Sequence, residues 1–214
     1  MLDLHILWDW NGTLLDDVEV SVASLCDLLN ELGMPPTDAD AYRAQMEAPV
    51  ERYYEKLFDL DRYPLPFLAE RFIKGYRRHI GKARLQQDAR QALELFAQAG
   101  LRQAILSSFE QSLLLTLLDH FEITPYFEFI SGAKDCLGQS KLDRAQALFQ
   151  QRGLLPARTF FIGDMVQDAE MAAALGANCI LIPGGHQRRE ELAACGAPLA
   201  GSLLQAAAQI LSRQ

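Results

Sequence analysis

The sequence predicts an α/β protein, in which helices cover a doubly wound parallel sheet and an all-helical segment is inserted near the start of the chain. Three patterns predict this. An apolar run over residues 4–8 stops at Asp9 and turns at Gly12, as a buried parallel strand does where it meets a loop. Residues 38–82 show helical patterns interrupted by prolines, and they show no strand pattern. From residue 88 onward helical and strand patterns alternate, which is typical of crossover connections.

The inserted segment begins with one amphipathic helix. Apolar residues recur at helical spacing from Val18 to Leu32, and Gly33 follows where a left-handed C-terminal cap is expected. The aromatic residues of the segment also recur at helical spacing, so we expect them to pack against neighbouring helices rather than to stack on bases. They are Tyr53, Tyr54, Phe58, Phe67, Phe72 and Tyr76.

The remaining elements follow in alternation. The patterns predict helices over residues 89–99, 113–121, 142–151, 169–175 and 202–212, and strands over residues 103–106, 127–130, 159–162 and 179–182. The sheet-forming part is therefore split in sequence, into residues 1–17 and 83–214, and residues 18–82 form a helical cap between them. A cap inserted after the first strand would close over the edge where Asp9 emerges.

Composition limits the possible partners. The 214 residues are 50% hydrophobic and 22% charged, with a formal net charge of −8. An acidic chain is a poor match for nucleic acid or an anionic membrane surface, so any phosphate site must be local. The first residues lack a basic segment before a long apolar core, and no apolar run could span a bilayer, so we expect a cytoplasmic protein. The cysteines lie far apart and are expected to be reduced thiols: Cys26, Cys136, Cys179 and Cys195.

Polar residues suited to one task follow three of the expected strands. These residues are Asp9, then Ser107, then Asp164 with Asp168, while Lys141 precedes a helix. Such strand ends converge in a doubly wound sheet, although they are distant in sequence. Carboxylates bind Mg²⁺, and a carboxylate can accept a phosphoryl group, while a lysine and a hydroxyl can bind the other phosphate oxygens. The set therefore favours phosphoryl transfer.

Four segments in this order resemble the motifs of the haloacid dehalogenase superfamily, specifically its phosphoglycolate phosphatase-like branch with a helical cap. They are Asp9-Trp10-Asn11-Gly12-Thr13-Leu14, Ile105-Leu106-Ser107-Ser108, Lys141, and Ile162-Gly163-Asp164-Met165-Val166-Gln167-Asp168. The resemblance covers nearly the whole chain and implies a Rossmann-like core with a helical cap. It also implies a magnesium-dependent phosphatase that acts on a small phosphorylated metabolite through an aspartyl-phosphate.

The resemblance also assigns roles to individual residues. Asp9 would be the nucleophile, and it would bind Mg²⁺ together with Asp164 and the main-chain oxygen of Asn11. Asp168 would hold the metal through water or orient its neighbours. Lys141 would favour the ionised form of Asp9 by its charge. The substrate would be bound by Trp10, Asn11, Ser107, Ser108 and Lys141.

One position departs from the family pattern. Phosphatases of the family carry a second aspartate two residues after the nucleophile, where this chain has Asn11. An amide cannot donate and recover a proton at neutral pH, so acid–base help worth about 10² to 10⁴ in rate should be missing. Four explanations are open. The enzyme is slow and limited to good leaving groups; Asp16, Asp17 or a cap residue supplies the proton; the chain binds phosphate without turnover; or Asn11 is not the working residue, because it was introduced or deamidates.

Other activities within the family follow from the same departure. Dehalogenases of the family also lack the second aspartate, but they work without metal and would not be expected to keep the acids at 164 and 168. A phosphonatase would need a cap lysine that forms an imine, for which Lys56, Lys74 and Lys82 are candidates. The alternative of a different class is a catalytically silent module that binds phosphate or protein. The chain is expected to be a monomer or a homodimer.

Two further residues lie near the expected site. The cap loop at residues 46–49 and the adjacent Arg52 are placed to select the substrate, although we expect Arg52 to pair with Glu47 or Glu55. His186 follows residues 183–185 at the same sheet edge, and we expect a solvated loop histidine there.

Overall fold

A five-stranded parallel sheet forms the centre of the molecule. The computed structural model describes residues 4–133 and 140–213. The strand order is β5-β4-β1-β6-β7, so the first strand of the chain is the middle strand of the sheet. The strands are β1 (His5–Trp8), β4 (Arg102–Glu110), β5 (Phe129–Ala133), β6 (Thr159–Gly163) and β7 (Asn178–Leu181). The predicted α/β fold with a parallel sheet is confirmed.

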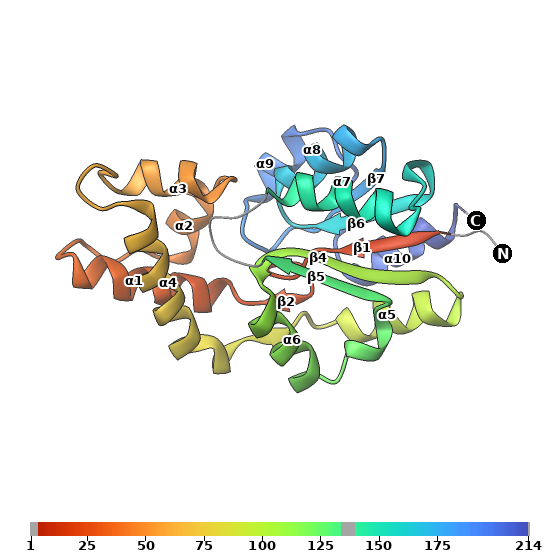
Figure 1. Ribbon diagram of the computed structural model, residues 1–214, viewed down its shortest axis with the longest axis horizontal. Coiled ribbons are helices and arrows are strands. Elements are labelled where there is room, and N and C mark those ends of the chain that lie inside the picture. Colours follow the sequence, from red (N-terminus) through yellow and green to blue (C-terminus); the bar gives the residue numbers. More distant parts are fainter. Residues whose placement is uncertain (1–3, 134–139, 214) are drawn as a thin grey trace.

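Alternation along the central strand produces a core on each face of the sheet. Ile6 and Trp8 pack on one face with residues of α5 and α10, whereas Leu7 packs on the other face with residues of α7 and α8. These helices, with α6, are α5 (Ala89–Gln98), α6 (Gln111–His120), α7 (Lys141–Arg152), α8 (Val166–Leu175) and α10 (Leu203–Leu211). Figure 1 shows α7 and α8 above the sheet and α5 and α6 below it. Burial on both faces explains why the strands appear in the sequence as apolar runs.

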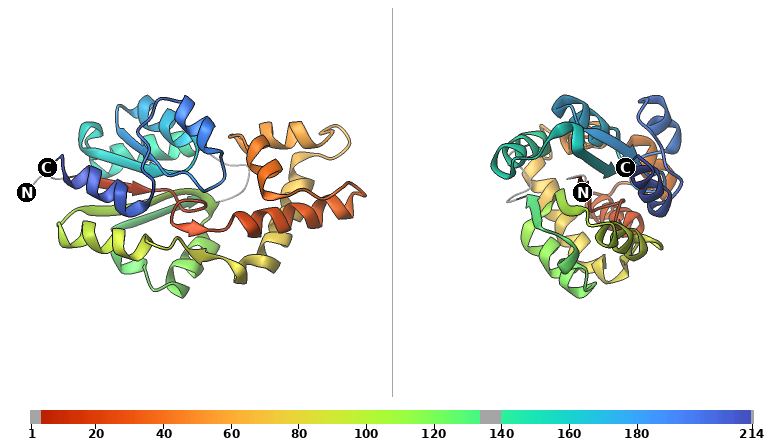
Figure 2. Two further views of the ribbon diagram at one scale, coloured as in Figure 1. Left: turned by 180° about the vertical axis from the view of Figure 1, so that it is seen from behind. Right: turned by 90° about the vertical axis from the view of Figure 1, so that its right-hand side faces the viewer.

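Four helices lie together beyond the carboxyl ends of the strands. They are α1 (Val18–Glu31), α2 (Ala39–Gln45), α3 (Val50–Leu57) and α4 (Leu65–His79), and we refer to residues 18–82 as the cap. Figures 1 and 2 show the cap at one end of the molecule and both chain termini at the other. The cap has its own hydrophobic cluster, which includes Leu25, Tyr53, Tyr54 and Phe58. The expectation that the cap aromatics pack against neighbouring helices is thus confirmed.

The two crossings between the cap and the sheet-forming part lie side by side. A short antiparallel ribbon pairs β2 (Leu15–Asp16) with β3 (Arg84–Leu85), and the helical turn η1 (Ile80–Lys82) precedes it. The sequence did not indicate this ribbon, because two-residue strands show no periodicity. The division into two domains at these crossings stays a prediction, and we propose the ribbon as their hinge.

Some element boundaries differ from the sequence-based ones. β4 continues to Glu110, so Ser107 and Ser108 lie within the strand and do not follow it. The two serines look like a strand end, but pairing with β5 continues through a register irregularity as far as Glu110 and Ala133. α8 begins at Val166, three residues before the predicted start, because the Asp168 side chain accepts a hydrogen bond from the Met165 main chain and caps the first turn.

The second half of the chain adds short elements that were not predicted. They are the turns η2 (Thr124–Tyr126) and η3 (Pro156–Arg158) and the helix α9 (Arg189–Ala194). Cys26, Cys179 and Cys195 are free thiols, and Cys136 lies outside the described residues. Within residues 4–133 and 140–213, no helix has both the length and the apolar character needed to cross a bilayer.

Candidate active site

The centre of the site is Asp9, at the carboxyl end of the middle strand. β1 lies between β4 and β6, which the chain reaches by crossing to opposite sides of β1, so a crevice opens at this strand end. The Asp9 main-chain N–H donates to the Ile162 carbonyl at 2.9 Å, which extends the sheet bonding by one residue. Asp9 Oδ1 accepts from the main-chain N–H of Trp10 at 2.8 Å. Asp9 Oδ2 forms an ion pair with Lys141.

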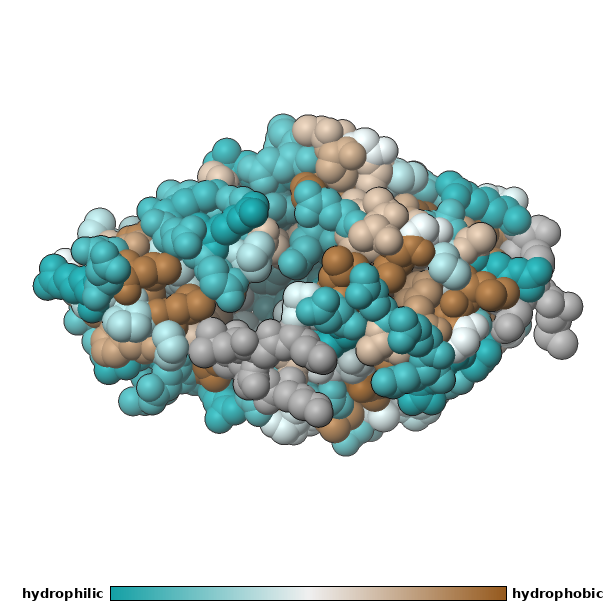
Figure 3. Space-filling view, turned by 45° about the horizontal axis from the view of Figure 1, so that its top comes forward, coloured by the Kyte–Doolittle hydropathy of each residue, from teal (hydrophilic) through white to brown (hydrophobic). Residues whose placement is uncertain are grey.

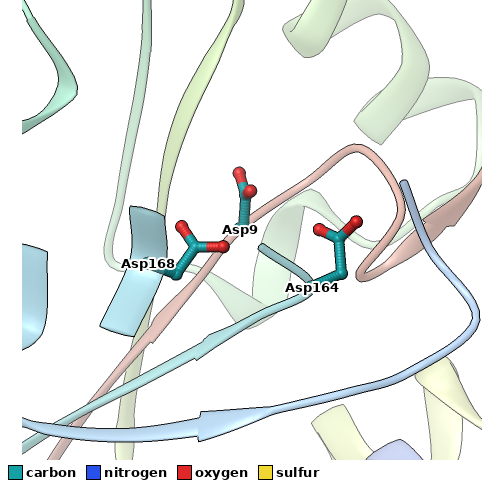
Figure 4. A group of neighbouring side chains, drawn as sticks. All are labelled: Asp9, Asp164 and Asp168. Carbon is teal, nitrogen blue, oxygen red and sulfur yellow. The ribbon is translucent and has the colours of Figure 1, made fainter. Parts of the chain in front are cut away.

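Lys141 joins two acids of the site. It is the first residue of α7 and is buried, with Nζ 2.9 Å from Asp9 Oδ2 and 2.7 Å from Asp168 Oδ1. Asp164 completes the group, because oxygens of Asp9, Asp164 and Asp168 all lie within 4.8 Å of one another. Figure 4 shows the carboxylates pointing to the same side from three different elements. The structure therefore brings together four residues that the sequence analysis placed at one edge.

Burial acts strongly on the charges of this group. Burial raises the pKa of Asp9 to about 6, although the Lys141 ammonium opposes the rise. Burial also raises the pKa of Asp164 to about 7, with His186 opposing it and the other two acids adding to it. Burial by itself lowers the pKa of Lys141, but Asp168 and Asp9 outweigh it, so this pKa lies above its usual value. Acids outnumber cations here, and a hard divalent cation with oxygen ligands fits such a donor set.

Asp164 is held by contacts on both carboxylate oxygens. Oδ1 accepts from the Thr13 hydroxyl at 2.9 Å, and Oδ2 accepts from the His186 main-chain N–H at 2.7 Å. Two glycines permit this close approach. A Cβ at Gly12, where φ is +70°, would lie 2.2 Å from Asp164 Oδ2, and a Cβ at Gly185 would lie equally close. Neither position has room for a side chain.

The amide of Asn11 is bonded to a second buried carboxylate, Asp17. Asn11 Nδ2 donates to Asp17 Oδ2 at 2.8 Å and to the Tyr76 hydroxyl at 3.1 Å. Tyr76 donates to the same Asp17 oxygen at 2.6 Å, and the Gly12 main-chain N–H donates to Asp17 Oδ1 at 2.9 Å. His186 Nε2 lies 3.2 Å from Asp17 Oδ1. Asp17 thus connects the turn after Asp9 to cap helix α4.

The charges of this second group are well matched. Burial raises the pKa of Asp17, but the His186 charge and the hydrogen bonds from His186, Tyr76 and Asn11 outweigh it, so the pKa lies below its usual value. Burial alone would lower the pKa of His186, yet Asp17 and then Asp164 raise it to about 9. His186 is therefore a buried ion-pair partner, and the expectation of a solvated loop histidine is wrong. The close approach of its ring depends on Gly12, where a Cβ would lie 2.7 Å from His186 Cδ2.

The remaining predicted site residues differ in how far their side chains are buried. Ser107 is buried and its Oγ accepts from the Phe109 main-chain N–H at 3.1 Å, whereas Ser108 is exposed. The Trp10 side chain is fully buried in the hydrophobic core, so only its main chain faces the site. Asp16 lies exposed on β2. The sequence analysis did not assign a site position to Thr13 or Tyr76, which reach the site through side-chain hydroxyls.

The surface between the cap and the sheet-forming part is hollowed. Figure 3 shows this hollow, with hydrophilic side chains on much of its visible rim. A pocket of about 310 Å³ lies between the two parts and is lined by Met46, Glu47, Arg52 and Lys56 of the cap and by Gln167 and Gln187, among others. Arg52 pairs with Glu47 at 3.2 Å, as expected. Val166, Gln167 and Glu170 of α8 also line the pocket, so it borders the helix that carries Asp168.

Comparison with known proteins is consistent with this geometry. A family model described as haloacid dehalogenase-like hydrolase matches residues 6–182. The chain belongs to the haloacid dehalogenase-like hydrolases. This hydrolase is 26% identical over 190 residues to a phosphoglycolate phosphatase of Pseudomonas putida, which covers 85% of this chain and 70% of that protein. It is 29% identical over 185 residues to a probable phosphoglycolate phosphatase of the same species, which covers 82% and 73%.

Solved structures show the same fold. A haloacid dehalogenase-like hydrolase from Streptococcus pneumoniae superposes with a TM-score of 0.85 at 22% identity, covering 97% of this chain and 98% of that one. A predicted phosphatase from Clostridium acetobutylicum superposes with a TM-score of 0.84 at 21% identity, covering 99% and 100%. The family model confirms the resemblance stated from the sequence motifs, and the named relatives make the chain a hydrolase related to phosphatases.

Proposed function

We propose that this hydrolase is a magnesium-dependent phosphomonoesterase that acts on a small phosphorylated metabolite. One observation carries the proposal: the Lys141 ammonium lies between Asp9 and Asp168, with Asp164 within reach of both acids. This arrangement supplies a carboxylate nucleophile, a fixed cation for phosphate oxygens and oxygen ligands for a metal. The names of the phosphoglycolate phosphatase relatives support the same reaction class.

The roles follow from these positions. Asp9, Asp164 and the main-chain oxygen of Asn11 would hold Mg²⁺, with Asp168 acting directly or through water. When bound, Mg²⁺ would reduce the repulsion between the substrate phosphate and the carboxylates. Asp9 would attack phosphorus while the bond to the leaving oxygen breaks, and water would then release phosphate from Asp9. Lys141 and the Ser107 hydroxyl would hold the phosphoryl oxygens. The metal, the aspartyl-phosphate and these residue roles all belong to the proposal.

Asn11 limits the leaving groups that this site can release. Its amide cannot supply a proton, and the neighbouring Asp17 already accepts four hydrogen-bond or ion-pair contacts that favour its ionised form. Asp16 lies exposed on the hinge ribbon. We therefore expect the enzyme to cleave esters whose leaving oxygen needs no proton, and to be slow on alkyl phosphates.

The test is phosphate release with and without Mg²⁺, after intact mass has confirmed that Asn11 is not deamidated. The substrates are p-nitrophenyl phosphate and a panel of alkyl phosphates that includes phosphoglycolate. We expect magnesium-dependent release from the aryl ester and loss of it in Asp9→Asn, which keeps the size of the side chain. Asp143→Asn, on the exposed face of α7, is the control for a general effect of removing a carboxylate.

Two other outcomes would change the assignment. Binding of Mg²⁺ and phosphate without turnover of any substrate would favour the catalytically silent module, which the absence of an acid at position 11 also supports. Release of phosphate from a phosphonate would favour a phosphonatase. Against that outcome, Lys56 faces the pocket but its Nζ lies 2.5 Å from Glu47 Oε2 in an ion pair.

A further inference from the structure

Arg144 makes a contact at the site that the roles above do not explain. It lies one turn after Lys141 on α7, and its Nη1 donates to the main-chain oxygen of Ser107 at 2.8 Å. The side chain is only partly exposed, and its Nε is buried without a hydrogen-bond partner among the described residues. A buried donor that finds no partner within residues 4–133 and 140–213 is costly for stability, so a structural role alone explains this arginine poorly.

The contact joins the two elements that carry the proposed phosphate ligands. Residues three apart share one face of a helix, so Arg144 lies on the same side of α7 as Lys141. Ser107 lies on β4, and the register of β4 beside β1 pairs Ile105 with Trp8. Ser107 is therefore level with the turn that follows Asp9. The hydrogen bond from Arg144 fixes this part of β4 relative to the start of α7.

Arg144 also brings a permanent positive charge toward Asp9. Burial lowers the pKa of the Arg144 guanidinium, and the Asp9 carboxylate counteracts part of that decrease. A guanidinium stays protonated throughout the pH range in which proteins are stable. The phosphoryl site therefore has two cations on one helix. Lys141 contacts Asp9, and Arg144 is hydrogen-bonded to the Ser107 main chain.

We propose that Arg144 is a positioning residue of the phosphoryl site, which fixes the Ser107 main chain so that its hydroxyl meets the phosphate and which adds positive charge at this end of α7. This inference rests on the proposed phosphatase function. Ser107 Oγ already accepts from the Phe109 N–H, which leaves its own proton to be donated to a phosphate oxygen. If the Arg144 bond is lost, the main chain near the β4 irregularity can shift and carry this hydroxyl away.

The experiment compares Arg144→Ala and Arg144→Lys with Arg152→Ala. Arg152 lies at the end of the same helix and packs over the Phe129 ring, so its substitution is the matched control for losing an arginine from α7. We expect Arg144→Ala to lose roughly 10- to 100-fold in kcat/KM, which is the usual range for a hydrogen bond to a charged group. Arg144→Lys should lose less, because it keeps the charge but not the fixed geometry.

Three further readings separate positioning from a general loss of structure. The affinity for inorganic phosphate should fall in Arg144→Ala, while the Mg²⁺ concentration for half-maximal effect should not change. Added guanidinium should restore part of the activity of Arg144→Ala and none in Arg152→Ala. Equal kcat/KM and equal phosphate affinity in Arg144→Ala and Arg152→Ala would overturn the inference, as would a loss explained entirely by a smaller folded fraction.

The same variants distinguish failure of the inference from failure of the proposed function. If the native protein hydrolyses nothing, the shift in Tm caused by inorganic phosphate becomes the measurement. A shift in the native protein that is lost in Arg144→Ala supports the inference and overturns only the hydrolysis. Equal shifts in both proteins overturn the inference, and a native protein that neither hydrolyses nor binds phosphate overturns both proposals.

Discussion

Asn11 and Asp17 are a matched pair, and this changes what substitution at position 11 can achieve. The Asn11 amide donates to Asp17 Oδ2 at 2.8 Å, inside a buried group. A carboxylate at position 11 would face another carboxylate at this distance, and two such groups cannot both be ionised without a large cost. Restoring the family's usual aspartate alone therefore leaves one of the two carboxyl groups protonated, or costs stability where both are ionised.

We predict that Asn11→Asp alone lowers the free energy of unfolding by about 1–3 kcal/mol at pH 8. The loss should be smaller at pH 5, because protonation removes the charge repulsion. The double variant Asn11→Asp with Asp17→Asn places an amide opposite the new acid. It should be more stable than the sum of the single changes and faster on alkyl phosphates. A denaturant-based double-mutant cycle measures the coupling, and strictly additive changes would contradict it.

Gly12 offers a second prediction, with a matched control in the same chain. Gly12 and Gly33 both have φ of +70°, but a Cβ at Gly12 would meet Asp164 Oδ2 at 2.2 Å, while a Cβ at Gly33 would meet nothing within 4 Å. Gly33→Ala should cost only the left-handed backbone energy, roughly 1–2 kcal/mol. Gly12→Ala should cost about 1–3 kcal/mol more, because both Asp164 and the His186 ring must move.

Denaturant unfolding of both glycine variants tests this difference, and Mg²⁺ titration adds a reading specific to the site. Gly12→Ala should weaken Mg²⁺ binding, whereas Gly33→Ala should leave it unchanged. Equal free energies of unfolding and equal Mg²⁺ affinities in the two variants would contradict the prediction. They would show that the position of Asp164 does not depend on a glycine at position 12.

At the scale of elements, the loop after β7 is hydrogen-bonded to the cap. Arg43 on α2 donates from Nε to the Gly185 carbonyl at 2.9 Å, and the Tyr42 hydroxyl is hydrogen-bonded to His186 Nδ1 at 2.9 Å. Gln187 Nε2 donates to the Met46 carbonyl at 3.1 Å. The same loop holds Asp164 through the His186 main chain, so the contacts of the cap and those of the acidic group meet in one short segment.

We predict that Arg43→Ala loosens the cap without changing the acidic group. The amides of α2 should exchange hydrogen faster, and KM should rise several-fold, because the cap loses the Arg43 contact to the loop after β7. Arg62→Ala is the control, since Arg62 is an exposed cap arginine that packs over the Tyr63 ring. Unchanged exchange in α2 would show that the contact does not hold the cap.

For the whole molecule, metal binding and stability should be linked. If Asp9, Asp164 and Asp168 hold Mg²⁺ only in the folded chain, the ion stabilises it by about 2.7 kcal/mol at one hundred times its dissociation constant. Tm should therefore rise with Mg²⁺ and return to its starting value after chelation, and hydrolysis should stop. Asp164→Asn should remove the dependence of Tm on Mg²⁺, and Asp143→Asn should keep it. A Tm that ignores Mg²⁺ in the native protein would contradict the metal site.

The sequence by itself determined the order of the main elements and the residues at their ends. Buried parallel strands appear as apolar runs, and Asp9 and Asp164 could be placed at strand ends because a short polar segment with glycine interrupts each run. Lys141 could be placed at the start of a helix, and the family motif then assigned its role. These signals are local, since a few neighbouring residues produce each of them.

Tertiary structure alone decided the second buried group and the contacts of the cap. Asp17, Tyr76 and His186 come from the start of α1, from α4 and from the loop after β7, and their hydrogen bonds span 59 and 169 positions of the sequence. No periodicity or spacing encodes such a meeting. Each of the three residues is a polar residue in an otherwise ordinary segment. Only the folded structure shows that all three are buried and that they are hydrogen-bonded to one another. The same reason explains why Arg144 could be recognised only once β4 and α7 had been placed side by side.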